Sequence, residues 1–295
     1  MEKLDNQINQ TVFSRIVENK TMLIGLIIIL IILIFAIFAD LIAPYNPLEF
    51  HMADRCQSPS AKYLFGTDNF GRDLFSRVVY GTRVSMRVGV LVVITISLFG
   101  TIIGLLTGYI STIDYYLMRV MDAFMAFPSV LLGISIVAML GATVTNVAIA
   151  LSIVYIPRTA RVVRGTVLSL KNSEFIRAAR AMGASDLRII FIHILPNSLA
   201  PLIVQVTFVF ATAVLAEAGL SFVGAGPPPP TPSWGNILSE GREYIRTYPW
   251  ITIFPGLFIA LTVLGLNLVG DGLRDILDPR LAKSVKDEKD TDENA

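Results

Sequence analysis

The sequence predicts an all-α integral membrane protein with six transmembrane helices, and three observations support this fold class. Charged residues make up 16% of the 295 residues, whereas soluble proteins carry about 25%. Hydrophobic residues make up 54%, and the mean hydropathy is +0.65. Apolar stretches of the length that crosses a bilayer also recur along the chain. They lie at roughly residues 22–42, 86–110, 119–140, 143–166, 198–222 and 250–271.

The first apolar stretch predicts a retained span and not a signal peptide. Met22 to Ala39 is uncharged, is long for a signal-peptide core and is not followed by a clear small-residue cleavage site. The third stretch gives the weakest signal, because Asp122 lies near its start and Pro128 lies within it. A proline is tolerated in a membrane helix where neighbours satisfy the freed carbonyl.

Basic residues predict the orientation, because cytoplasmic segments carry more Lys and Arg. With the N-terminus inside, the inner segments hold 16 of the 24 Lys and Arg residues. We therefore expect cytoplasmic tails at 1–21 and 273–295, a first helix at 22–42 and a core of five helices over 86–272.

An extracytoplasmic segment at 43–85 is expected to contain a helix lying in the membrane interface. Leu74 and Val78 recur at helical spacing beside Arg72 and Arg77, and arginines of such a helix can reach lipid headgroups. The alternative places this stretch in the cytoplasm, which requires a different number of spans.

The outer loop at 223–249 is rich in proline. Four consecutive prolines favour a stiff extended segment, so no regular helix is expected from Val223 to Leu238. Trp234 is expected at the outer headgroup level, where tryptophan is enriched.

Three glycines four residues apart, Gly100, Gly104 and Gly108, lie in the second span. Small residues at this spacing allow two helices to approach closely. They predict helix packing, within this chain or against a partner; the alternative is that glycine is simply common in membrane helices.

An ionisable residue at membrane depth is unfavourable and is often functional. Glu217, followed by Ser221 and Phe222, ends the apolar stretch of the fifth span. We expect these residues to line a path through the membrane or its outer gate. The alternative is a solvated carboxylate at the outer boundary.

Arg158, Arg161 and Arg164 recur every third residue at the inner end of the fourth span. The simplest expectation is that all three extend to lipid phosphates.

A charged stretch of about 25 residues interrupts the apolar pattern at 173–197. Phe175, Ala178, Ala179 and Met182 form a shallow apolar helix face, and Gly183 is a natural helix end. A second helix is expected from Ser185 to Pro196. The exposed apolar face either docks a partner or packs on the chain's own spans.

This stretch resembles the cytoplasmic "EAA" loop of ABC-importer permeases. The matching residues are Ala178, Ala179, Gly183, Leu195 and Pro196, while Arg177 and His193 replace a glutamate and an isoleucine of the family pattern. The stretches "FGTDNFGRDLFSRVVYGTRVSMRVG", "LSFVGAGPPPPTPSWGNIL" and "GDGLRDILDPR" resemble the C-type subunit of the dipeptide/oligopeptide/nickel branch.

The resemblance implies a type I ABC-importer permease fold in a bacterial or archaeal cytoplasmic membrane, with a coupling loop at 167–197. It implies as partners a second homologous permease subunit, one or two cytoplasmic ATP-binding subunits, an extracytoplasmic solute-binding protein and membrane lipid. ATP and Mg would be bound by the ATPase subunits, so this chain would hold no cofactor. The residues it implies for coupling to the ATPase are Glu174, Arg177, Ala178, Ala179, Arg180, Gly183 and Ala184. The implied substrates are di- or oligopeptides, with glutathione or nickel chelates as alternatives.

The sequence contains no motif for an enzyme. It has no phosphate-binding G-x-x-x-x-G-K-[ST], no H-E-x-x-H and no G-x-S-x-G, so we expect no catalytic residue and no ATP hydrolysis by this chain. Two histidines are too few for a metal site, and a net charge of +1 excludes the basic face of a nucleic-acid binder. Two rival classes are an ion-gradient-driven secondary transporter and a membrane scaffold.

Overall fold

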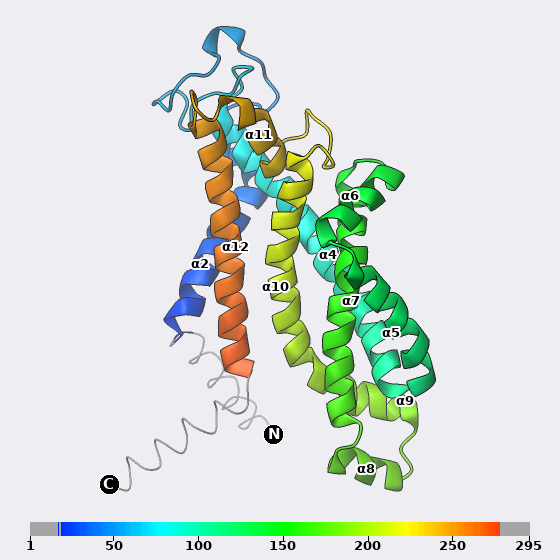
Figure 1. The fold of residues 1–295 in the computed structure, drawn as a ribbon. Coiled ribbons are helices and arrows are strands. Elements are labelled where there is room, and N and C mark those ends of the chain that lie inside the picture. The colour runs from blue at the N-terminus through cyan, green and yellow to red at the C-terminus, as the bar shows by residue number, and fades with distance from the viewer. Residues whose placement is uncertain (1–16, 18, 278–295) are drawn as a thin grey trace, which may run out of the picture.

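The fold is a bundle of long helices in a computed structural model that describes residue 17 and residues 19–277 (Figure 1). Five of the described helices are long and apolar enough to cross a membrane, or six if one bent pair counts as a single span. The tails predicted at 1–21 and 273–295 lie largely outside the described residues. The long helices are α2 (Lys20–Ile37), α4 (Leu74–Tyr109), α5 (Ser111–Ala126), α6 (Ser129–Leu140), α7 (Val144–Leu170), α10 (Leu195–Phe222) and α12 (Trp250–Leu277).

Shorter elements lie at the two ends of the bundle. One end carries the segment between α3 (Ala39–Ile42) and α4, with η1 (Met52–Asp54), and also α11 (Trp234–Gly241) and η3 (Arg242–Tyr244). We refer to it as the α11 end. The opposite end, the α8 end, carries α8 (Glu174–Ala181) and α9 (Asp186–Arg188).

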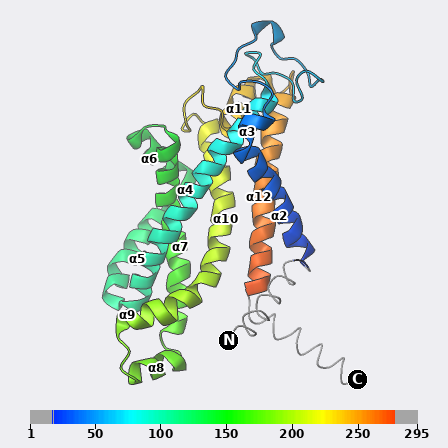
Figure 2. The same cartoon turned by 180° about the vertical axis from the view of Figure 1, so that it is seen from behind.

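Helix α4 connects the two halves of the bundle. It runs obliquely from the α11 end to the α8 end and packs against α2, α10 and α7 (Figures 1 and 2). Helices α2 and α12 pair on one side of α10, while α7 lies on its other side with α5 and α6. Buried hydrophobic side chains of α4, α6, α7 and α10 form one core, and those of α2, α4, α10, α11 and α12 form a second.

The interfacial helix predicted before residue 86 does not exist as a separate element. Asp73 caps α4, accepting a hydrogen bond from the Ser76 amide at 2.8 Å, and α4 continues for 36 residues without a break. Leu74 and Val78 are fully buried against α11 and α12. The amphipathic spacing was therefore correct, but the apolar face meets protein and not lipid.

The third predicted span is bent by 97° between α5 and α6. The break lies at Phe127 and Pro128. Phe127 is extended, with φ −86° and ψ 142°, the conformation that a following proline favours. The predicted span therefore consists of two helices, with Pro128 at the break between them.

The second helix predicted in the 173–197 stretch is continuous with the fifth span. From α9 the chain passes through a π-helical segment, η2 (Ile189–Ile194), into α10. The Leu195 amide donates to the carbonyl of Ile190, five residues back. Pro196 lies in the first turn of α10, directly after this π-helical segment, and has no N–H to donate to the preceding turn.

The proline-rich loop contains a helix that was not predicted. Helix α11 starts at Trp234, after Ser233 accepts a hydrogen bond from the Asn236 amide at 3.2 Å. Trp234 is fully buried, and its Nε1 donates to the Val78 carbonyl at 3.1 Å. Trp234 therefore packs inside the protein, because α11 folds back onto the start of α4, and its depth relative to the headgroups stays a prediction.

Two of the three arginines on α7 form ion pairs with α5. Arg161 donates to Asp122 at 2.6 Å, and Arg164 donates to both oxygens of Asp114, one of them at 2.7 Å. The expectation that all three reach lipid phosphates was wrong for these two, because the required aspartates lie on a neighbouring helix.

The glycines of α4 lie against α7 of the same chain. A Cβ added to Gly100 would lie 2.9 Å from the Thr159 side chain, and one added to Gly108 would lie 2.5 Å from Val167 Cβ. At Gly104 the nearest atoms are Val163 Cβ at 2.6 Å and a backbone oxygen of α7 at 2.7 Å. This backbone contact leaves no room for a side chain.

We expect Gly104→Ala to destabilise the protein by about 1–3 kcal/mol, the usual effect of overpacking. The matched control is Gly165→Ala on α7, where an added Cβ meets no atom within 4 Å. Thermal unfolding of the purified protein in detergent measures the difference. Equal melting temperatures for the two variants would contradict the close packing of α4 on α7.

Candidate functional site

Helix α8 projects at the end of the bundle opposite α11 (Figure 1). It begins after Ser173 and ends at Met182. Glu174 lies in its first turn and Arg180 in its last, so both charges complement the helix dipole. The helix has eight residues and is too short to be stable alone, so its packing on the bundle must hold it.

One side of α8 is buried against the chain itself. Ile176 is fully buried and joins a cluster with Ile189 and Ile194 of η2 and with Val163 of α7. Ala179 is 6% exposed. Of the two alternatives for the apolar face, Ala179 therefore follows the second and packs on the chain itself: Ile176 and Ala179, three residues apart, form the inward face.

The remaining surface of α8 is open in this chain. Apolar side chains are prominent there: Met182 is 84% exposed and Phe175 is 47% exposed. Of the residues implied for coupling, Ala184 is partly buried and joins the same cluster as Ile176. The exposed ones are Glu174, Arg177, Ala178, Arg180 and Gly183.

Gly183 ends α8 in the left-handed conformation, with φ +86°. This geometry lets the Ala184 amide donate to the Ala179 carbonyl at 3.1 Å, a bond typical of glycine-terminated helices. Ser185 then caps the next helix, accepting from the Arg188 amide at 3.4 Å. Gly183 thus sets the direction in which the chain leaves α8.

The α8 segment is fixed to α4 through Tyr109, the last residue of that helix. Its hydroxyl donates to Asp186 and accepts from Arg180 Nη2 at 3.2 Å. The Lys171 ammonium donates to the Tyr109 carbonyl at 2.8 Å. Nothing in the sequence pattern predicts these contacts of Tyr109, because its partners are 62 to 77 residues away in the chain.

The segment is therefore joined to three long helices. Lys171 directly follows α7, Tyr109 ends α4, and η2 leads without a loop into α10. A force on α8 reaches all three through continuous helices and charged hydrogen bonds. Such an element can transmit a rigid-body movement.

Glu217 is fully buried where α4, α10 and α11 meet. Its carboxylate accepts hydrogen bonds from the hydroxyls of Ser85 and Ser221, both at 2.8 Å. The alternative of a solvated carboxylate at the outer boundary is wrong. Phe222 lies under the Arg242 guanidinium, 5.8 Å from the ring centroid, and a role of these residues in a gate stays a prediction.

We expect Glu217→Leu to lower stability by about 1–3 kcal/mol, because it leaves two buried hydroxyls without their acceptor. Glu217→Gln keeps an oxygen for one serine and offers an N–H to the other, so it should unfold close to the unmodified protein. Thermal unfolding in detergent compares the two variants. If the glutamine variant were the less stable, the serine contacts would not be what holds Glu217.

A buried ionic cluster closes the α11 end. Arg77 contacts Asp68 and donates to Glu240 at 2.6 Å, and Arg72 donates to Asp68 at 2.6 Å and also contacts Glu240. Arg77 and Asp68 are fully buried and Arg72 is 3% exposed. These four residues, the Arg77 cluster, carry two positive and two negative charges. The prediction that Arg72 and Arg77 reach lipid headgroups is therefore wrong. Both arginines are buried in the protein, where Asp68 and Glu240 of α11 neutralise them.

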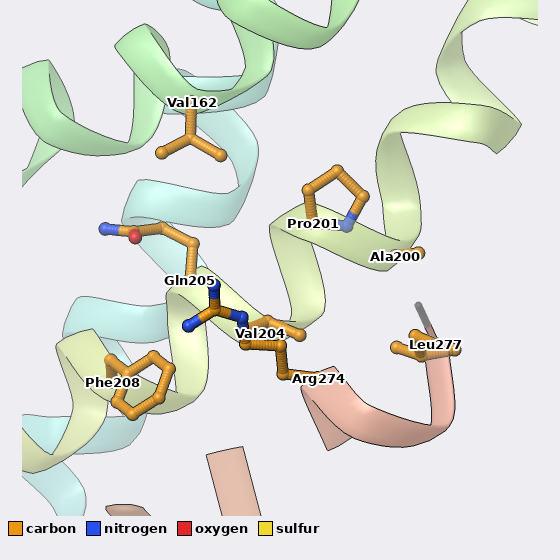
Figure 3. A pocket seen from close by; sticks show the side chains of 8 residues that line it. All are labelled: Val162, Ala200, Pro201, Val204, Gln205, Phe208, Arg274 and Leu277. Atoms are coloured by element: carbon orange, nitrogen blue, oxygen red, sulfur yellow. The ribbon is translucent and has the colours of Figure 1, made fainter. Parts of the chain in front are cut away.

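Two cavities open along the seam between α7 and α10. The Gln205 cavity, about 470 Å³, lies toward the α8 end; its walls include Val162, Pro201 and Phe208, with Gln205 and Arg274 as polar groups (Figure 3). The Tyr155 cavity, about 320 Å³, lies at the bend between α5 and α6 and is described below.

Among the described residues, no group of three His, Cys, Asp or Glu side chains could hold a metal ion.

Comparison with known proteins identifies the fold. A solved structure described as inward-facing MetNI methionine ABC transporter superposes with a TM-score of 0.55 at 22% identity, covering 70% of this chain and 98% of that one. The long apolar helices and the projecting α8 segment therefore belong to an all-helical, multi-pass membrane fold that this transporter chain shares.

Sequence comparison gives the family. The family described as "Binding-protein-dependent transport system inner membrane component" matches residues 77–283. The "N-terminal TM domain of oligopeptide transport permease C" matches residues 9–59. The chain belongs to this family of ABC-transporter permeases, in the C-type branch.

Several curated relatives are similar over most of their length. The dipeptide transport system permease protein DppC of Alkalihalophilus pseudofirmus is 49% identical, covering 91% of this chain and 89% of the relative. The di/tripeptide transport system permease protein DppC of Pseudomonas aeruginosa is 43% identical, covering 90% of each. The glutathione transport system permease protein GsiD of Pectobacterium atrosepticum is 43% identical, covering 83% of this chain and 82% of the relative.

Proposed function

We propose that this chain is a permease subunit of an ATP-driven importer of short peptides. The observation that carries the proposal is the α8 segment: an exposed helix with an apolar patch, fixed to the ends of α4, α7 and α10. The dipeptide and di/tripeptide permeases among its relatives support the substrate class.

In this proposal α8 faces the cytoplasm, as do both termini, and it docks into an ATP-binding subunit. That subunit binds ATP and Mg, so this chain takes no part in hydrolysis. Closure of the ATPase pair moves α8, and the three attached helices transmit the movement to a path shared with a second permease subunit. A solute-binding protein delivers the peptide at the α11 end.

Uptake by the reconstituted importer tests the proposal. We expect proteoliposomes that contain both permeases, both ATPases and the solute-binding protein to accumulate the dipeptide Ala-Ala only with ATP. Uptake that persists without the ATPase subunits and stops when an ion gradient is collapsed would make the chain a secondary transporter instead.

Glutathione is the second candidate, because a glutathione permease is 43% identical to this chain. Competition separates the two solutes in the same proteoliposomes. Excess Ala-Ala should suppress glutathione uptake more strongly than the reverse if peptides are the substrate. The opposite order would assign glutathione.

A further inference from the structure

The seam between α7 and α10 contains cationic and polar groups that the fold does not use. Arg158, Arg161 and Arg164 lie on α7 at steps of one turn, and the last two have aspartate partners on α5. Among the described residues, Arg158 has none within ion-pair distance. It lies near the middle of α7 and its side chain is exposed in this chain. An ionisable residue without a partner within a membrane-spanning helix marks a candidate functional position.

Arg158 lines the Tyr155 cavity together with the Tyr155 ring. Tyr155 is 8% exposed, and its hydroxyl makes no hydrogen bond to any residue in 19–277. The ring is largely buried, and a tyrosine in this setting normally directs its hydroxyl to a hydrogen-bond partner. Its free donor and the Arg158 guanidinium therefore open into the same space.

The bend between α5 and α6 adds further donors to this cavity. Ser129, which starts α6, is one of its lining residues, and no side chain caps the first turn of this helix. The free amides at a helix start favour an anionic group. Phe124, Phe127 and Val154 supply apolar walls around these donors.

The Gln205 cavity, which lies closer to α8, also combines a guanidinium with a second hydrogen-bond donor. Gln205 is 9% exposed, and its Nε2 has no hydrogen-bond partner. The Arg274 guanidinium lies beside it in Figure 3, and no acidic residue of the described chain lies within ion-pair distance of Arg274. A cation and an unused donor are again combined with apolar walls.

The two cavities occupy consecutive positions on the same helix faces. Tyr155, Arg158 and Val162 fall on one face of α7, and Gln205, Phe208 and Thr212 fall on one face of α10. Seven residues of helix separate Tyr155 from Val162, a rise of about 10 Å. An extended chain of three residues spans about the same distance.

We propose that this seam binds the carboxylate of the transported solute at two levels: first between Arg158 and Tyr155, then between Arg274 and Gln205. The inference rests on the proposed function and adds to it the group that is recognised. Each level offers a guanidinium and a second donor, the pairing that carboxylates favour. Every short peptide with a free C-terminus carries this group, so the seam accepts different side chains.

Uptake of Ala-Ala by the reconstituted importer tests the first level. Arg158→Gln should lower the maximal rate at least about tenfold, Arg158→Lys should remain within about threefold, and Tyr155→Phe should fall between them. The matched control is Arg87→Gln, because Arg87 is exposed on α4 and lines neither cavity.

A labelling experiment reads binding directly. In a Cys56→Ser background, Thr212→Cys places a thiol in the wall of the Tyr155 cavity. We expect Ala-Ala to protect it from a methanethiosulfonate reagent, and its C-terminal amide, Ala-Ala-NH₂, to protect it far less. Arg158→Gln should abolish the difference. Equal protection by both compounds would overturn the carboxylate assignment.

The outcomes separate this inference from the proposed function. If the unmodified importer shows no ATP-dependent Ala-Ala uptake, the proposed function fails. If it transports Ala-Ala and the Arg158 and Tyr155 variants are equally fast, only the seam assignment fails. Loss of co-purified phospholipid from Arg158→Gln with normal uptake would also overturn it, because the cavity would then hold a lipid phosphate.

Discussion

Replacing Gly183 with valine is expected to stop ATP-driven uptake while leaving the helical bundle intact. Gly183 adopts φ +86°, which costs an L-residue roughly 1–2 kcal/mol and a β-branched residue more. No atom lies within 4 Å of an added Cβ, so the strain is entirely in the backbone. Valine would break the bond from Ala184 to Ala179 and re-aim α8, which we expect to lower uptake by more than about tenfold and to weaken ATPase attachment.

Gly183→Asn is the matched control, because asparagine tolerates the left-handed conformation. Like valine, it adds a side chain in open space, but it should retain most of the uptake because its backbone can keep the angle. The measurements are Ala-Ala uptake and the amount of ATPase subunit that co-purifies. Normal uptake by the valine variant, or equal loss in both variants, would count against control of coupling by this backbone angle.

Replacing Arg77 with methionine is expected to have the largest effect on folding. Methionine removes a buried guanidinium and leaves Asp68 and Glu240 with one cation, Arg72, for two carboxylates. Removing one partner of a buried ion pair costs about 3–5 kcal/mol. Because Arg72 keeps its contacts, we expect the free energy of unfolding to fall by about 3 kcal/mol, the lower end of this range. That loss should release α11 from α4 and reduce the amount of folded protein recovered from membranes.

Two variants make this result specific. Arg77→Met combined with Glu240→Gln restores the charge balance and should recover part of the lost stability, which a double-mutant cycle measures. Lys62→Met removes an ion pair with Asp54 in which the side chains are 60% and 22% exposed, so it should lower the free energy of unfolding far less than Arg77→Met does. A double variant as unstable as the sum of its single variants would contradict the coupling of Arg77 to Glu240.

Local patterns predicted the long helices because each is encoded by consecutive residues. The apolar stretches gave the cores of α2, α7, α10 and α12, and Gly183 with Ser185 gave the end of one helix and the start of the next. Helix continuity was harder. Pro196 suggested an end but lies in the first turn of α10, and the start of α4 was assigned to the interface because its apolar face has the same spacing in either setting.

Long-range pairing could not be read from the sequence. Arg77 and Glu240 are 163 residues apart, and Tyr109 and Asp186 are 77 apart. The three arginines of α7 have the same spacing in the sequence, and only the structure distinguishes them. Arg161 and Arg164 pair with aspartates of α5, whereas Arg158 lines a cavity. On α8, an eight-residue helix allows more than one apolar face, and only the packing of Ile176 shows which one is buried.

Site-directed cross-linking of α8 tests the central claim most directly. In a Cys56→Ser background, cysteine replaces exposed Ala178 or buried Ala179. Each variant is assembled with ATPase subunits that carry single cysteines on the surface facing the permease. We predict that Ala178→Cys forms a disulfide with the ATPase subunit and that Ala179→Cys does not. Contradiction would come from labelling of Ala178→Cys by a membrane-impermeant reagent added outside intact cells, because no ATPase subunit could then reach α8.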